Sequence, residues 1–468
     1  MSRSRGTTPW ILPHCRSSDS TMVGSVTLPD EFSDSLKHAL KVINSADLLR
    51  VVSHHDADGI AAAAIMTGAL THAKKQFHLT ITKGLDADVV ESLAKEGNEV
   101  ILFLDMGSGQ IDSLEHLEAK IAVLDHHKPI RKSKKVVQAN PHFYNIDGMT
   151  ESCASALSFL AAIMMDPCNW NLSPIAIAGI IGDRQHMGGM KGINQQILDY
   201  AAEKEYVNVQ RGLNLKGPTV ADAIADSIDP YFVGLSGRKD NVLAFLDSMK
   251  LNPSTPMGAL DEIYRRKLTS MLSLRLMGQG CRPETVEELV SEIPWIPSMS
   301  MSAMDLADLL NACGRMDHEG VGVALCMGDD DALALAGDLR REYNRKILEK
   351  LLHIETDGVS QMTSIQFFNV EDASLAGAQT GLAMQYILDQ SKPTLALSHV
   401  KNKVKVSSRG TKYLVSKGLD LSAALKKASE KMGGIGGGHA VAAGATISEG
   451  KEEEFLKNVD ELVSLQLR

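Results

Sequence analysis

Short apolar runs that end at acidic or imidazole side chains recur along the first half of the chain. The runs Leu48–Val52, Val100–Leu104 and Ile121–Leu124 have the length and composition of buried strands. The stretches between them that have the apolar spacing of helices are Gly59–Lys75, Asp86–Glu96 and the shorter Ile111–Leu117. Because strands that alternate with helices are typical of βαβ units, this pattern predicts a doubly wound, mostly parallel α/β sheet.

The rest of the chain predicts further helices and a second, smaller α/β unit. Apolar helices that end near Met165 and Gly182 follow the third strand. Residues 216–336 are mostly amphipathic helix interrupted by prolines, and a charged stretch with helical spacing comes next. From Thr363 onward, strands and helices alternate again. We therefore expect a disordered N-terminal extension (1–28), an α/β domain (29–215), a helical region with a connecting helix (216–353) and a C-terminal α/β domain (354–468).

Composition and charge indicate a globular protein of ordinary solubility. The 468 residues are 44% hydrophobic and 23% charged, and no apolar run approaches the roughly 18 residues of a membrane span. A net charge of -10 argues against binding nucleic acid through bulk charge, but not against a small local basic groove. The six cysteines have no paired spacing, which favours free thiols in a reducing compartment. We expect a cytoplasmic protein with no membrane partner.

Side chains that ligate divalent metals lie where the predicted elements end. The carboxyl ends of strands form the ligand-binding edge of an open α/β sheet, so these side chains are expected to converge there. Converging carboxylates would cost several kcal/mol in repulsion and desolvation if no cation were bound. Two Mn²⁺ or Mg²⁺ ions remove that cost, and oxygen-rich sites with few histidines suit these metals better than zinc. The expected ligands are His54, Asp56, Asp58, Asp105, His126 and Asp183.

Each motif by itself has a simpler explanation, but their order is specific. The HxDxDG pattern at 54–59 also suits a solvated turn or a calcium loop, and a DHH triplet such as 125–127 often occurs by chance. Here each follows an apolar strand, and a Gly-Asp pair follows at 182–183. Two ions about 3.5 to 4 Å apart can activate water and hold both oxygens of an in-line displacement at phosphorus, which predicts hydrolysis of a phosphoester or phosphoanhydride. His55 and His186 are expected to be packing or surface residues, because six ligands already fill two sites.

Positive charge precedes a glycine-rich run in the C-terminal domain. The basic residues are Lys401, Lys403, Lys405, Arg409, Lys412 and Lys417. An edge strand that lysines protect from aggregation is one explanation. The glycine loop 433–439 favours another, since backbone amides without side chains can approach an anion closely. Aromatic residues make up only 4% of the chain, so phosphate contacts rather than stacking should dominate the binding of a strand.

These motifs resemble those of a known family. HHDADG (54–59), LFLDMG (102–107), VLDHH (123–127) and IIGDRQ (180–185) are similar to the four motifs of the DHH family of phosphoesterases. GGIGGGH (433–439) resembles the glycine-rich signature of the DHH-associated C-terminal domain. The resemblance spans residues 50–447 and is greatest to archaeal RecJ-like nucleases. It implies a DHH domain at 29–215, a DHH-associated domain at 354–468 and an active-site cleft between them.

The resemblance also implies a role for each matching residue. One metal ion would be held by His54, Asp56 and Asp105, and the second by Asp58, Asp105, His126 and Asp183. Asp105 would bridge the two ions, His127 would contact the scissile phosphate, and Asp125 would orient His126. Substrate contacts are expected from Ser408, Arg409, Gly436, Gly437, Gly438 and His439. The segment Leu309–Arg315 is similar to a RecJ-like Asn-Ala-x-Gly-Arg segment, for which we expect no catalytic role.

The leading hypothesis is a metal-dependent exonuclease that releases mononucleotides from single-stranded DNA or RNA. The same motifs would support a phosphodiesterase for very short oligonucleotides or cyclic dinucleotides. A non-catalytic replisome scaffold is a third possibility, because some relatives have lost their metal ligands, whereas all six positions are filled here. The expected partners are single-stranded nucleic acid or short oligonucleotides, together with replication or repair proteins.

Overall fold

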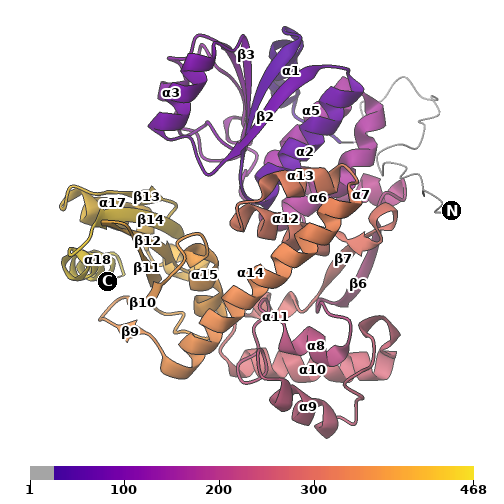
Figure 1. Cartoon of the computed structure of the whole chain (residues 1–468), viewed down its shortest axis with the longest axis vertical. Helices are drawn as coiled ribbons and strands as arrows, with labels where there is room; N and C mark the ends of the chain where they lie inside the picture. The colour runs from indigo at the N-terminus through magenta and orange to yellow at the C-terminus, as the bar shows by residue number, and fades with distance from the viewer. Residues whose placement is uncertain (1–25, 468) are drawn as a thin grey trace, which may run out of the picture. The chain divides into compact units, whose positions relative to one another are not determined.

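The computed structural model describes residues 26–467, and these fall into two compact units (Figure 1). Within the described residues, unit 1 combines 26–212 with Glu292–Arg341, and unit 2 combines Leu213–Ser291 with 342–467. The expected helical region 216–353 is therefore divided between the two units. Most of the expected disordered extension lies outside the described residues, but Val26 and Leu28 pack against the core of unit 1.

A five-stranded parallel sheet forms the centre of unit 1. Its strands are β1 (Leu48–His54), β2 (Gln76–Thr82), β3 (Val100–Leu104), β4 (Lys120–Leu124) and β5 (Val137–Ala139). Their order is β2-β1-β3-β4-β5, and every neighbouring pair is parallel. The expected doubly wound sheet is confirmed. The sequence analysis missed both edge strands, because β2 is only half-buried and β5 has only three residues.

Helices cover both faces of this sheet, because alternate side chains of each strand point to opposite faces. Leu49 and Val51 pack into the core on one face, whereas Val52 and Ile101 pack on the other. The helices of the first core are α1 (Asp30–Asn44), α2 (Ala57–His72), α5 (Ala154–Met165) and α6 (Ser173–Gly182). Those of the second are α3 (Ala87–Glu96) and α4 (Ile111–Leu114).

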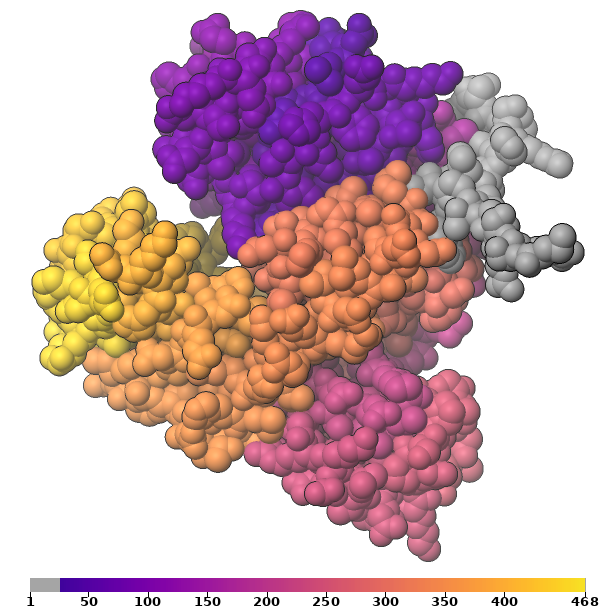
Figure 2. Space-filling view, viewed as in Figure 1, coloured from indigo at the N-terminus to yellow at the C-terminus, as the bar shows by residue number. Residues whose placement is uncertain are grey.

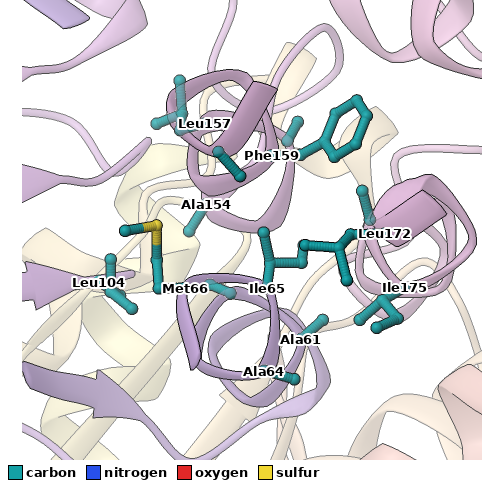
Figure 3. Packing of buried hydrophobic residues seen from close by; sticks show 14 of the residues in the cluster. Ala61, Ala64, Ile65, Met66, Leu104, Ala154, Leu157, Phe159, Leu172 and Ile175 are labelled. Carbon is teal, nitrogen blue, oxygen red and sulfur yellow. The ribbon is translucent and has the colours of Figure 1, made fainter. Parts of the chain in front are cut away.

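Small residues allow α2 to lie at the centre of the first core. Its alanines and glycines let α5 and α6 approach closely, and almost all of α2 is buried. Figure 3 shows Ala61 and Ile65 of α2 gathered with Leu157 and Phe159 of α5 and with Leu172 before α6. A helix that is apolar on all sides is stable only when it is surrounded in this way. This packing holds the N-terminal end of α2 at the carboxyl end of β1.

The segment 292–341 returns to unit 1 and adds two helices to the same core. Helix α12 (Ala303–Arg315) contacts α2 and α6, and helix α13 (Glu319–Cys326) contacts α2 and α12. Between α6 and α12 the chain also forms α7 (Gly192–Glu203) and a small sheet of β6 (Asn208–Leu213), β7 (Val290–Ile296) and β8 (Met301–Ser302). Helix α14 (Asp330–Asp357) then continues into unit 2.

Unit 2 contains a six-stranded mixed sheet and two groups of helices. The sheet order is β13-β14-β12-β11-β10-β9. Its strands are β9 (Ser360–Gln361), β10 (Gln366–Val370), β11 (Thr394–Val400), β12 (Lys403–Arg409), β13 (Ile435–Gly438) and β14 (Ala442–Ser448). The helices near it in sequence are α15 (Ala376–Tyr386), α16 (Lys412–Ser416), α17 (Leu421–Glu430) and α18 (Glu452–Gln466). The earlier helices are α8 (Val220–Ala225), α9 (Lys239–Ser248), α10 (Glu262–Gly278) and α11 (Pro283–Glu287).

The structure excludes the edge-strand explanation for the basic residues of unit 2 and corrects the expected glycine loop. The basic strand β12 is not an edge strand, because β11 and β14 pair with it on both sides. The glycine run is not a loop, because Ile435–Gly438 forms the edge strand β13 beside β14. A Cβ on Gly436 would lie 2.7 Å from the Leu425 carbonyl oxygen, so glycine lets this strand pack closely on α17.

On the face shown in Figure 2, the atoms of the N-terminal half of unit 1, indigo to violet, form one closed surface. Across residues 26–467, every helix is too short or too polar to cross a membrane.

We predict that Gly179→Ala destabilises unit 1. A Cβ at this position of α6 would lie 2.3 Å from Ser155 Oγ and 2.9 Å from Ala61 Cβ. Overpacking of this kind costs about 1–3 kcal/mol of unfolding free energy, which chemical denaturation would measure. The control is Gly337→Ala in α14, where the new Cβ would lie 3.7 Å from the Arg341 side chain, an ordinary contact distance. Helix propensity there favours alanine by up to about 1 kcal/mol. Equal unfolding free energies for the two variants would contradict the packing described for α6.

Candidate metal centre

The expected metal ligands meet at the point where the strand order reverses. β2 lies on one side of β1, and β3 and β4 follow on the other side. The connection from β1 to β2 and the connection from β3 to β4 therefore run in opposite directions, away from the β1–β3 pair. Crevices of this kind, at the carboxyl ends of parallel strands, are the usual ligand sites of doubly wound sheets. His54 is the last residue of β1, and Asp105 directly follows β3. Parallel pairing places these two strand ends side by side.

The first donor group consists of His54, Asp56 and Asp105. His54 Nδ1 lies 3.1 Å from Asp56 Oδ2 and 3.2 Å from Asp105 Oδ2. Asp56 also caps α2, because its side chain accepts a hydrogen bond of 3.0 Å from the Gly59 amide. A Cβ on Gly59 would lie 2.4 Å from the His54 carbonyl oxygen, which explains why the motif ends in glycine. One ligand atom from each of the three residues lies within 4.8 Å of the others.

The second donor group consists of Asp58, His126 and Asp183. His126 Nε2 lies 3.9 Å from Asp58 Oδ2 and 3.8 Å from Asp183 Oδ2. Both oxygens of Asp58 accept backbone hydrogen bonds at the start of α5, from the Ala154 amide at 2.8 Å and the Ser155 amide at 2.9 Å. The positive end of a helix dipole therefore stabilises the Asp58 carboxylate and sets its orientation.

Asp105 lies between the two groups. Its Oδ1 is 3.3 Å from His126 Nε2, and its Oδ2 contacts His54. The residue adopts a left-handed backbone conformation with φ of 58°, a strained conformation that is common at functional sites. Its Oδ1 is buried and accepts no hydrogen bond from any residue in 26–467. A buried carboxylate oxygen without a donor is costly, and a divalent cation would satisfy it. The donor set therefore fits two divalent ions that share Asp105.

The electrostatics of the cluster are those of acids and imidazoles crowded together in a buried site. Burial and the charge of Asp105 raise the pKa of Asp58 to about 7. Burial also raises the pKa of Asp183, to about 6. Burial favours the neutral forms of His54 and His126, but the neighbouring carboxylates outweigh it and raise the pKa of both rings well above the usual value. The protein thus partly neutralises the cluster with protons, which a divalent ion would displace.

The structure corrects the expected role of Asp125. Its Oδ1 lies 2.7 Å from His127 Nδ1 and accepts a hydrogen bond of 3.1 Å from the His127 amide, so it orients His127 rather than His126. The Gly148 carbonyl oxygen, 2.6 Å from His126 Nδ1, orients His126 instead. Where the chain leaves β4 extended, residues 125 and 127 point to one side and 126 to the other. Although burial favours the neutral ring, Asp125 raises the pKa of His127 above its usual value.

Several residues that position the ligands were not identified from the sequence. Gln185 donates hydrogen bonds to Asp183 Oδ2 at 2.7 Å and to the Gly148 carbonyl at 2.8 Å. Because the same carbonyl contacts His126 Nδ1, Gln185 connects Asp183 with His126. His55, expected to be a packing or surface residue, has its Nδ1 3.2 Å from His54 Nε2 and orients that ring. The sequence signals for them were their places in the motifs, Gln185 at the end of IIGDRQ and His55 within HHDADG.

The RecJ-like segment at the end of α12 has a clear packing role. A Cβ on Gly314 would lie 1.8 Å from the His55 carbonyl oxygen, so only glycine lets α12 contact the first motif. Together with burial and His54, the charge of the adjacent Arg315 lowers the pKa of His55 to about 4. Arg315 therefore lies near the first donor group. That Arg315 has no catalytic role stays a prediction.

The expected substrate contacts of unit 2 gather at one end of three neighbouring strands. Ser408 and Gly438 both pair with Ala443 of β14, and Arg409 pairs with Ala442. The Ser408 hydroxyl donates a hydrogen bond of 2.9 Å to the Ala443 carbonyl. His439 forms backbone hydrogen bonds with Ala442 at the turn.

Glycine has a different function at each position of β13. Packing requires it at Gly436, as described above, and Gly438 has a positive φ of 138°. A Cβ on Gly437 would meet nothing within 4 Å, so Gly437 leaves open space in front of the backbone. Binding of a substrate phosphate by these residues stays a prediction.

Two family models match this chain, the DHH family N-terminal domain over residues 49–180 and the DHHA1 domain over residues 365–465. A curated relative, the uncharacterised protein MJ0831 of Methanocaldococcus jannaschii, is 33% identical over 439 residues, which cover 92% of this chain and 96% of the relative.

Solved structures share the fold at low sequence identity. RecJ from Thermus thermophilus in complex with Mn²⁺ is 16% identical with a TM-score of 0.59; the match covers 94% of this chain but only 55% of that RecJ. CDC45 from Entamoeba histolytica is 11% identical with a TM-score of 0.62, and the match covers 93% and 99% of the two chains. The two domain models and the extended match to MJ0831 show that this chain belongs to the DHH family, with a DHHA1 domain after its DHH domain and a RecJ-like fold.

Proposed function

We propose that this protein is a metal-dependent phosphodiesterase that degrades single-stranded DNA or RNA from an end and releases mononucleotides. The observation that carries the proposal is the pair of donor groups with Asp105 between them. Asp105 Oδ1 is buried and accepts no hydrogen bond within residues 26–467. The RecJ with which the chain shares its fold was crystallised with Mn²⁺, which supports manganese or magnesium as the metal. The oxygen-rich donor set supports the same two metals.

Each residue of the centre has a role in this proposal. One ion would be held by His54, Asp56 and Asp105, and the other by Asp58, Asp105, His126 and Asp183. Two such ions supply Lewis acidity and a water molecule of lowered pKa. The ring of His127, which Asp125 holds, would contact a phosphate oxygen and donate a hydrogen bond to it when it is protonated. The contacts of Asp58 with α5 and of His126 with Gly148 hold these donors in place before substrate binds.

A non-catalytic scaffold is the second candidate. CDC45 shares the fold over almost the full length of both chains, which shows that this fold is not restricted to RecJ proteins. Six side chains of types that ligate metals converge here, which supports retained chemistry, because their mutual repulsion and burial are costly unless ions bind. If wild-type protein supplied with Mn²⁺ hydrolysed no DNA or RNA, the result would favour the scaffold.

We predict that Asp105→Asn lowers hydrolysis of an end-labelled single strand in Mn²⁺ by at least about 100-fold, the effect expected when one preorganised electrostatic group is removed. The first donor group would lose a charge, and His126 of the second group would lose its charged neighbour. The backbone conformation is kept, because Asn tolerates positive φ. The matched control is Asp199→Asn on α7, an exposed carboxylate that bonds only Gln195 in the described structure. Activity of Asp105→Asn close to that of wild type would contradict a shared ligand.

Substrates of different length and sugar separate the exonuclease from a short-oligonucleotide enzyme. We expect 30-mers of DNA or RNA, labelled separately at each end, to yield mononucleotides progressively from one end. Gel electrophoresis of a time course would show the ladder and its polarity. Turnover of 5-mers alone would instead assign the protein to short oligonucleotides.

We predict that affinity for Mn²⁺ rises as the pH rises from about 5.5 to 8. The raised pKa values of Asp58 and Asp183 mean that protons occupy these carboxylates below about pH 6 to 7, and the ions must displace them. Calorimetry in two buffers of different ionisation enthalpy should therefore detect proton release on binding. Asp58→Asn should release fewer protons near pH 6 than wild type. An affinity that does not change over this pH range would disagree with the metal assignment.

A further inference from the structure

A positively charged loop directly follows the DHH motif on the same edge of the sheet as the metal centre. Residues 128–135 contain five cationic side chains, although the chain as a whole is acidic. Arg131 is neutralised, because it pairs with Asp112 at 2.6 Å and Glu115 at 2.8 Å. Lys135 donates hydrogen bonds to backbone carbonyls of residues 115 and 117. The other three cations of this loop, Lys128, Lys132 and Lys134, are exposed and have no acidic partner among residues 26–467.

Aromatic rings lie beside these lysines. The short helix η1 (Pro141–Tyr144) places Phe143 and Tyr144 under Lys132, whose Nζ is 5.8 Å and 5.6 Å from the two ring centroids. Tyr144 also packs on Phe32 of α1, with ring centroids 5.3 Å apart, so its ring is fixed from the core side. Phe143 stands at 88° to Tyr144 and is half-buried. Unpaired cations interleaved with aromatic rings are the typical surface for single-stranded nucleic acid.

The loop and η1 are joined rigidly to the DHH motif. Asn140, which caps η1, donates a hydrogen bond of 2.8 Å to the His127 carbonyl and another of 2.9 Å to Ser108 Oγ. The Ser108 amide in turn donates to Asp125 Oδ2 at 2.9 Å, and the Ser108 carbonyl accepts from the Ile130 amide. A strand that lies on this surface would therefore keep a fixed position relative to His127.

We propose that the surface formed by Lys128, Lys132 and Phe143, which we call the loop–η1 surface, binds the single strand next to the scissile phosphate. Lys128 and Lys132 contact strand phosphates, and the Phe143 ring stacks on a base. This inference rests on the proposed function only in that the scissile phosphate is placed at the metal centre. No acidic side chain among the described residues neutralises these lysines. Phosphates of the strand would relieve their mutual repulsion.

The test is the salt dependence of strand binding by Lys128→Ala/Lys132→Ala. The matched control is Lys41→Ala/Lys204→Ala, which removes the same charge from unit 1 and includes a lysine 5.2 Å from the Tyr200 ring. Fluorescence anisotropy with a labelled 20-mer, in an Asp105→Asn background that prevents degradation, gives Kd from low to moderate salt. Each single-strand phosphate contact contributes about 0.7 to the slope of log Kd against log salt, so the test pair should lower the slope by about 1.4 and the control pair should not.

Two further measurements separate the outcomes. Phe143→Leu should weaken binding about fivefold at every salt concentration without changing the slope, because stacking involves no counter-ion release. With Asp105 intact, kcat/KM of the lysine pair should fall more for a 20-mer than for a dinucleotide. An unchanged slope in the lysine pair would overturn the loop–η1 surface even if the enzyme degrades nucleic acid. A lowered slope in a protein that hydrolyses nothing would overturn the proposed function but support the surface.

Discussion

The crowding of four carboxylates at one edge of a parallel sheet is the constraint on which the rest of this structure depends. Asp56, Asp58, Asp105 and Asp183 lie at the ends of elements that apolar packing holds in place, so they cannot separate to relieve their repulsion. Protons neutralise them in part, as the raised pKa of Asp58 indicates. Divalent ions neutralise them more completely, because one ion can bind oxygens from several carboxylates at once. The free energy of apolar packing therefore keeps these carboxylates close together despite their repulsion.

Glycines and a strained backbone bring the ligands close enough for this to occur. Glycine at 59 lets α2 begin directly beside the His54 carbonyl, and glycine at 314 lets α12 contact the His55 carbonyl. The left-handed conformation of Asp105 turns its carboxylate toward both donor groups immediately after β3. Neither glycine supplies a ligand, yet each controls a distance that the ligands need. Such strain persists only where the surrounding structure is rigid, as the buried core around α2 is.

Charge is distributed unevenly over the chain in a way that suits an anionic substrate. The acidic side chains of the centre attract cations, whereas the lysines that follow His127 remain without acidic partners among the described residues. A negatively charged strand would therefore be held by the lysines while its phosphodiester is neutralised at the metal centre. The net charge of -10 conceals this arrangement, because it averages over surfaces with opposite roles.

The sequence by itself determined the parallel sheet of unit 1 and the identity of the side chains that converge at its edge. Apolar runs report local burial, and a polar residue that ends each run must lie at the carboxyl end of a strand, so both could be inferred without coordinates. The partners of those side chains could not. Only packing decided that Asp58 accepts hydrogen bonds from amides 96 and 97 residues away, that Asp125 orients His127, and that residues 292–341 return to unit 1. Local patterns specify which face of an element is buried, whereas the choice of the element that covers it is a property of the whole fold.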